Sequence, residues 1–173
     1  MTEHVFEVAP SGRSKCRGCG QSIAKGELRF GERMPNPFGD GNMTHWHHPR
    51  CAAHRRPEPL LEALQAGAYE EDNRMDLEAA AQRGIAHRRL PRLGALEQAS
   101  SGRARCRHCR ELIEKEAWRL PLVFFEEGAY NPGGFIHAAC AVGYCETPDV
   151  VDTIACFAPA MSSADIAALL DSQ

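Results

Sequence analysis

The stretch that decides the fold is SGRSKCRGCGQSIAKGELRFG at residues 11–31, and it is followed by WHHPRC at residues 46–51. The same pattern returns as SGRARCRHCRELIEKEAWRLP at residues 101–121 and FIHAAC at residues 135–140. The long segments align without a gap at an offset of 90 residues, and the short segments align at an offset of 89. Self-similarity of this kind indicates a duplicated unit, and the positions that both copies share point to what the unit needs.

Cysteine and histidine occupy matching places in the two copies. Each copy has a CxxC pair followed by an HxxC pair, with 28 intervening residues in the first copy and 27 in the second. Two such hooks supply the four ligands of a tetrahedral zinc site, and disulfide-linked or merely buried cysteines would not place a histidine at the same position twice. The spacing therefore predicts two structural zinc ions with closed coordination. Their expected ligands are Cys16, Cys19, His48 and Cys51 in the first copy, and Cys106, Cys109, His137 and Cys140 in the second.

The remaining histidines and cysteines near these motifs have simpler interpretations. The first HxxC motif follows two other histidines, in HWHH at residues 45–48. Only His48 has the spacing that the second copy repeats, so we assign it as the ligand and keep His47 as the alternative. Cys145 and Cys156 have no counterpart in the first copy, and we interpret them as small buried side chains.

The bulk composition is that of a globular protein with small cores. The chain has 173 residues, of which 43% are hydrophobic and 7% aromatic. This length suits one ordinary domain or two small ones, and modules of ~60–80 residues often need a metal to complete their stability. Because there is no signal-peptide pattern and no apolar run of transmembrane length, we expect an intracellular chain with reduced thiols. The Ala- and Arg-rich composition favours the cytoplasm or nucleoid of a bacterium, or the nucleus if the source is eukaryotic.

The expected fold class is α+β, with two small zinc-stabilised modules that each combine a short antiparallel sheet with flanking helices. Alternating apolar residues predict strands at 27–32 and 117–125, separated from the next strand in the first copy by a turn-rich loop at 36–42. Helix patterns and end signals predict further elements at 59–65, at 76–89, and after a Ser162–Asp165 capping box. The expected domains are residues 3–75 for the first finger, 76–95 for a helix and linker, and 96–173 for the second finger with a C-terminal helix.

The assembled pattern, SGRxxCxxC followed by LRFG and HWHHxxC, resembles the zinc finger of poly(ADP-ribose) polymerases, which is also found on a DNA ligase and recognises DNA strand breaks. The resemblance covers most of the first copy, from Phe6 to about Leu64, and the second copy keeps the metal ligands and both arginines. Fingers of this family bind broken or gapped duplex through its phosphate backbone, and they stack apolar loop side chains on the exposed base pair.

The resemblance implies DNA-binding roles for six residues. They are Arg13, Arg29, Arg103 and Arg119 as phosphate-contacting arginines, and Phe38 and Met43 as stacking side chains of the loop. Such a protein needs no base-edge readout, because the arginine fork binds phosphate and each stacked base contributes ~1–3 kcal/mol. In the second copy, Glu126 and Glu127 would repel a DNA backbone, so we expect a weaker DNA role there. We interpret Trp46 and Phe135 as packing around the metal.

Charge does not exclude nucleic acid as the partner. The net charge is −3, but residues 1–60 hold nine Lys and Arg against six acidic residues, which leaves −6 on the remainder. A locally basic face is sufficient for phosphate contact. The arginines of the knuckles, including Arg17, Arg107 and Arg110, are interpreted as solvated or as donors to thiolates.

The sequence therefore predicts a non-enzymatic, two-finger binder of DNA strand breaks or ends, with no catalytic domain. Its expected partners are broken DNA and a repair protein, with no membrane and no small-molecule substrate. One alternative is a protein-interaction module that has kept the zinc scaffold and lost DNA binding. A second alternative is a redox sensor that uses the CxxC thiolates.

Overall fold

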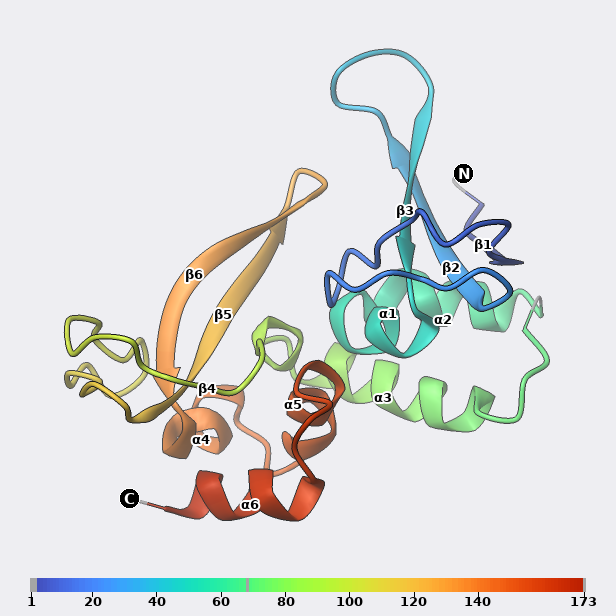
Figure 1. Ribbon diagram of the computed structural model, residues 1–173. Coiled ribbons are helices and arrows are strands. Elements are labelled where there is room, and N and C mark those ends of the chain that lie inside the picture. Colours follow the sequence, from blue (N-terminus) through green and yellow to red (C-terminus); the bar gives the residue numbers. More distant parts are fainter. Residues whose placement is uncertain (1–2, 68, 173) are drawn as a thin grey trace. The chain divides into compact units, whose positions relative to one another are not determined.

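The computed structural model describes residues 3–67 and 69–172 and divides the chain into two compact units, Met1–Ala86 and His87–Gln173 (Figure 1). Each unit contains a three-stranded antiparallel sheet and several short helices, which confirms the α+β fold class. Within those described ranges, no helix is both long enough and apolar enough to cross a membrane.

The first unit consists of one sheet followed by a layer of helices. The strands pair in the order β1-β2-β3, and three helices follow them. Prolines occupy the first helical turns of the first two helices, where their missing N–H groups cost nothing. The elements are β1 (Val5–Val8), β2 (Leu28–Pro35), β3 (Asn42–His47), α1 (Pro49–Arg55), α2 (Pro57–Gln65) and α3 (Arg74–Ala86).

The core of the first unit lies between the sheet and its helices. Phe30 of β2 is fully buried and belongs to one cluster with Leu60 and Leu64 of α2 and Leu77 of α3. Full burial of each such side chain contributes roughly 1.5–3 kcal/mol. The short helix α1, which contains the metal-ligand candidate Cys51, contributes only alanines to this cluster. Alanine allows the helix backbone to approach the sheet closely, and this closeness keeps Cys51 beside the knuckle.

The second unit repeats the sheet but has different helices. Its strands pair in the order β4-β5-β6, and the Ser162 side chain accepts a hydrogen bond from the Asp165 N–H at 3.1 Å, as the capping box predicts. The expected linker region, 76–95, supplies part of each unit, since α3 packs on α1 and α2 while Leu90 and Leu93 are buried in the second core. The elements are η1 (Leu90–Arg92), β4 (Glu97–Gln98), β5 (Trp118–Glu126), β6 (Ala129–His137), η2 (Ala138–Cys140), α4 (Ala141–Cys145), α5 (Val151–Phe157) and α6 (Ser163–Asp171).

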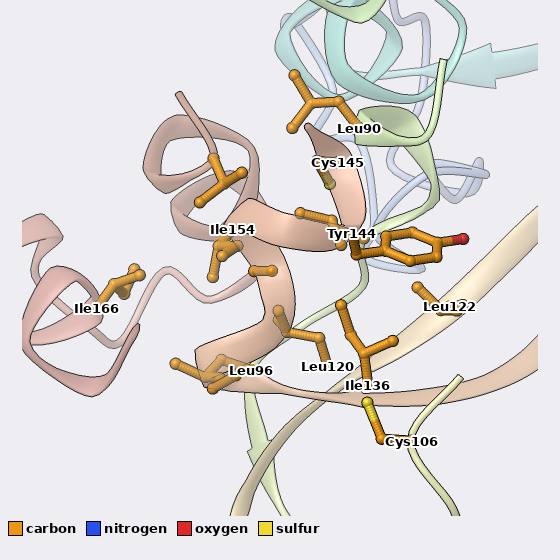
Figure 2. Packing of buried hydrophobic residues seen from close by; sticks show 14 of the residues in the cluster. Leu90, Leu96, Cys106, Leu120, Leu122, Ile136, Tyr144, Cys145, Ile154 and Ile166 are labelled. Atoms are coloured by element: carbon orange, nitrogen blue, oxygen red, sulfur yellow. The ribbon is translucent and has the colours of Figure 1, made fainter. Parts of the chain in front are cut away.

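Aliphatic side chains from the beginning, the middle and the end of the second unit's sequence form its core. Figure 2 shows Leu120 and Ile136 of the sheet facing Leu96, with Ile154 and Ile166 arriving from the last two helices. Because Leu120 and Ile136 are directly opposed across β5 and β6, their register fixes which face of the hairpin is buried.

The two long hairpins end differently. Between β2 and β3 the chain makes a wide loop, whereas β5 and β6 are joined by a narrow turn (Figure 1). Glu126 pairs with Ala129, so only Glu127 and Gly128 form the second turn, with φ angles of 50° and 80°. Two consecutive positive φ values are typical of the tight type I′ turn, which follows the twist of the strands. The second hairpin therefore has no loop equivalent to residues 36–41.

Candidate metal centres and nucleic-acid interface

Four side chains of the first unit converge as the spacing predicts. Cys16 and Cys19 lie on the knuckle before β2, His48 follows β3, and Cys51 lies on α1, and their ligand atoms are all within 4.8 Å of one another. The His48 Nδ1 atom is 3.4 Å from Cys19 Sγ and 3.8 Å from Cys51 Sγ. Tetrahedral zinc with Zn–S of about 2.3 Å and Zn–N of about 2.0 Å separates sulfur from nitrogen by about 3.5 Å. The cluster therefore fits one zinc ion.

The second unit has an equivalent cluster. Cys106, Cys109, His137 and Cys140 also place their ligand atoms within 4.8 Å of one another. The His137 Nδ1 atom is 3.3 Å from Cys109 Sγ and 3.9 Å from Cys140 Sγ. These values again agree with a tetrahedral ion, so the chain has two Cys3His groups that could each hold zinc.

Hydrogen bonds lower the pKa of one thiol in each cluster. The Cys16 thiol is hydrogen-bonded to Cys51 and to backbone N–H groups that include that of His48, and together these lower its pKa to about 4 despite burial. Burial raises the pKa of Cys106, but the N–H groups of Cys109, His137 and His108 outweigh it and lower that pKa to about 6. A thiolate is the form that binds metal, so one sulfur in each cluster is already favoured in that form.

Cys19 and Cys140 are harder to ionise than ordinary thiols. Burial, followed by the negative charge of Cys106, raises the pKa of Cys140 to about 12. Burial likewise raises the pKa of Cys19. Several thiolates this close together are stable only around a cation, and a zinc ion would supply the charge.

The second ring nitrogen of each ligand histidine faces an oxygen atom. His137 Nε2 lies 3.1 Å from the Leu112 carbonyl oxygen, within hydrogen-bond distance, whereas His48 Nε2 lies 3.6 Å from a Glu27 carboxylate oxygen, which is too far for a hydrogen bond. The Leu112 contact fixes the tautomer of His137, so that Nδ1 is the nitrogen left to bind metal. Neither partner was expected from the sequence, because Glu27 has Ala117 as its counterpart and the Leu112 contact is made by backbone.

His47, the alternative ligand, lies outside the four-atom cluster. Its side chain is fully buried, and its ring centroid is 6.4 Å from that of Phe30. Burial lowers the pKa of His47 to about 4, so the ring is neutral at physiological pH. His47 ends β3, and His48 continues with an extended backbone as the N-cap of α1, so the two adjacent side chains face opposite sides.

Two of the expected phosphate-contacting arginines are stacked on aromatic rings. The Arg29 guanidinium carbon lies 3.6 Å from the Trp46 ring centroid, and Arg119 lies at the same distance from Phe135. Each is also paired with a carboxylate of the first strand in its sheet, Glu7 at 2.5 Å and Glu97 at 3.0 Å. Both arginines are only 8% exposed. These contacts repeat at the offsets of the duplication, so self-comparison could have singled out the two glutamates.

The other expected DNA-binding residues lie on the surface or near it. Arg13 and Arg103 are exposed on the segments that precede the two knuckles. Phe38 is 94% exposed at the end of the β2–β3 hairpin, where its N–H donates to Asn36 Oδ1 at 3.0 Å. Met43 is half-buried on β3. The structure thus presents an apolar ring to solvent at the position where stacking on a base pair was expected.

Comparisons with known proteins agree with this arrangement. Residues 7–87 match the family described as "Poly(ADP-ribose) polymerase and DNA-Ligase Zn-finger region". The chain is 28% identical over 165 residues to poly [ADP-ribose] polymerase 1 of Gallus gallus, an alignment that covers 80% of this chain and 16% of that protein. It is 31% identical over 127 residues to the enzyme of Danio rerio (66% and 12%) and 44% identical over 48 residues to that of Caenorhabditis elegans (28% and 5%). The chain therefore spans about one-sixth or less of the length of these relatives.

Proposed function

Since the chain belongs to the zinc-finger family of poly(ADP-ribose) polymerases and DNA ligases, with two tandem Cys3His modules, we propose that it binds DNA strand breaks or ends without sequence specificity. In this proposal, zinc has a structural role in both units. The protein acts as a DNA-repair accessory inside the cell, without catalytic activity of its own, by occupying ends or recruiting a repair protein.

The exposure of Phe38 is the observation that supports this function best. A phenylalanine that is 94% exposed contributes little burial to the folded state, so its ring is accessible to a ligand at the position where the family resemblance places a stacking side chain. A break or an end differs from continuous duplex because it exposes the face of a base pair. An aromatic ring at the end of a hairpin can stack on that face without reading the sequence. Met43, which lies on the adjoining strand, would extend the apolar contact.

Phosphate contacts would hold the finger in register on the DNA. Arg13 and Arg103 are exposed and can reach phosphate directly. Arg29 and Arg119 are held by their stacking contacts, and a carboxylate occupies one edge of each guanidinium. Phosphate would have to replace that carboxylate or bind the remaining N–H groups. In this proposal the two buried arginines are preorganised, and their contribution depends on competition with Glu7 and Glu97.

A protein-interaction function is the second candidate for the second unit. The narrow turn of its hairpin carries Glu126 and Glu127, both exposed, in place of an apolar loop. This difference favours unequal roles for the two units over two equivalent break sensors.

The proposed function is tested with two DNA dumbbells of identical sequence, one with a single nick and one sealed by ligation. Fluorescence anisotropy of the zinc-loaded chain is measured on each across a salt series. We expect tighter binding to the nicked dumbbell and a steep loss of affinity with salt, because phosphate contacts release counterions. Equal affinity for both dumbbells would contradict break recognition. Binding to neither would favour the protein-interaction alternative.

A further inference from the structure

A cluster of cationic and aromatic side chains on the second unit takes no part in the function proposed above. We call it the Tyr144 surface. Its cationic members are Arg89, which follows α3, Arg92 of η1 and Arg107 of the zinc knuckle. Its ring-bearing members are His108 of the same knuckle, Phe124 of β5 and Tyr144 of α4.

Tyr144 is the centre of this surface. Its hydroxyl accepts a hydrogen bond from Arg92 Nη1 at 3.2 Å, and its carbonyl accepts one from Arg89 Nη1 at 3.2 Å. The His108 ring approaches edge-on, with ring centroids 6.4 Å apart. Figure 2 shows the Tyr144 hydroxyl pointing away from the aliphatic core. The ring thus packs on the core with one end and holds cationic side chains at the other.

Phe124 extends the surface along the hairpin. The Arg92 guanidinium carbon lies 4.6 Å from the Phe124 ring centroid. A Cβ atom at Gly133 would collide with the Phe124 ring, and one at Gly134, which has a φ of 90°, would lie 2.5 Å from Arg107 Nε. Two adjacent glycines therefore seat Phe124 and Arg107 against the backbone of β6. The arginines of η1 and of the knuckle consequently border the same stretch of hairpin.

The arginines of this surface have no carboxylate partners in the described part of the chain. Among the residues that the structure describes, Arg89, Arg92 and Arg107 form no ion pair with a carboxylate. Residues 87–119 contain nine Lys and Arg and four acidic residues, whereas residues 120–173 contain seven acidic residues and no Lys or Arg. Guanidinium groups held on aromatic faces lose less conformational freedom on binding an anion, and their N–H fork matches phosphate oxygens.

The first unit has no equivalent of this surface. At the offsets of the duplication, Tyr144 corresponds to Arg55, which is buried, and His108 corresponds to Gly18. A Cβ at Gly18 would lie 3.4 Å from Arg55 Cγ, so the two positions are also adjacent in the first unit, but with different side chains. The surface is therefore a property of the second unit alone.

We propose that the Tyr144 surface binds the phosphodiester backbone of uninterrupted duplex DNA. This inference rests on the proposed function and divides it between the units: the first unit caps the break, and the second holds continuous duplex beside it. The two-residue turn at Glu127–Gly128 leaves the second hairpin without a loop for stacking, so its DNA contact is electrostatic. DNA fits better than an acidic peptide, because three arginines that have no carboxylate partner among the described residues, one before η1, one in η1 and one on the knuckle, match the repeated charges of a backbone.

The test compares the parent chain with R92Q/R107Q on the nicked and sealed dumbbells. Loss of two phosphate contacts should reduce the salt slope by about 2 and lower affinity by roughly 10- to 60-fold near 0.1 M salt. Both dumbbells should be affected equally, so the preference for the nick is kept. The single variant R107Q, whose side chain is exposed, guards against an effect of Arg92 on folding, and zinc content with circular dichroism verifies the fold.

The matched control is K115Q, which removes one exposed charge from the turn that precedes β5. It should leave the affinity and the salt slope near those of the parent chain. Unchanged affinity and slope in R107Q and R92Q/R107Q would overturn the inference, provided that the parent chain still prefers the nick. Loss confined to the nicked dumbbell would also overturn it. So would binding of a poly-glutamate peptide that these variants abolish while DNA binding is kept. If the parent chain itself shows no preference, the proposed function fails instead.

Discussion

Replacing Phe38 with alanine should remove break recognition while leaving the fold intact. The side chain is 94% exposed, and its ring has no aromatic contact among the described residues. Truncation of an exposed side chain changes the free energy of unfolding by no more than about 0.5 kcal/mol. Any loss of DNA affinity can therefore be attributed to the missing ring.

The size of the effect follows from the area that stacking would cover. A phenylalanine side chain buries about 150–250 Å² when it is enclosed, and stacking on a base pair covers about half of that. About 100 Å² at about 25 cal/mol per Å² gives about 2.5 kcal/mol, within the range of ~1–3 kcal/mol for a stacked base. After allowance for ordering of the loop, we expect a loss of about 2 kcal/mol, or roughly 30-fold in Kd.

The assay is fluorescence anisotropy of F38A on the nicked and sealed dumbbells, with thermal unfolding of the free protein measured in parallel. Affinity for the nicked dumbbell should fall and affinity for the sealed one should not. M75A is the matched control, because Met75 is 79% exposed on α3 of the same unit and should have no effect on either DNA. An equal loss on both dumbbells, or no loss on the nicked one, would refute the argument that Phe38 stacks at the break.

Three further predictions concern charge and burial. Glu7→Gln should free an edge of Arg29 and strengthen DNA binding several-fold in the same titration, whereas weaker binding would mean that the ion pair mainly positions the arginine. Glu32, whose side chain is 4% exposed, forms a two-pronged ion pair with Arg56, so Glu32→Gln should destabilise the first unit by about 3 kcal/mol in urea unfolding, and a change below about 1 kcal/mol would contradict this. Burial raises the pKa of Cys145 to about 12 from an ordinary 9.0, so the unfolded thiol ionises first and stability should fall by about 1.4 kcal/mol per pH unit above pH 9. In thermal unfolding at alkaline pH, Cys145→Ala should show a shallower fall than the parent, and parallel curves would argue against the raised pKa.

The metal centres could be predicted closely from the sequence because zinc imposes a local rule. CxxC and HxxC each place two ligands on a single turn, so the spacing alone determines which atoms can meet. His48 was separated from His47 by the duplication, and strand alternation supplies the physical reason. The fold class followed from the same motifs together with the alternating strands.

Contacts between distant segments could not be predicted in the same way. Self-comparison can single out Glu7 through its counterpart Glu97, but the partnership of Glu7 with Arg29 arises only when β1 pairs with β2. The short helix α1 has too few residues to show a clear helical period. The Tyr144 surface combines residues of five elements and has no counterpart in the first unit, so neither periodicity nor self-comparison indicates it.

Hydroxyl-radical footprinting on a linear duplex of several hundred base pairs with one nick tests break recognition most directly. A second duplex carries the nick at a different position, and both are probed with the zinc-loaded chain near its Kd. We expect protection on both strands around the nick, and this protection should move with the nick. Protection spread evenly along the duplex, or confined to one sequence regardless of where the nick lies, would contradict it.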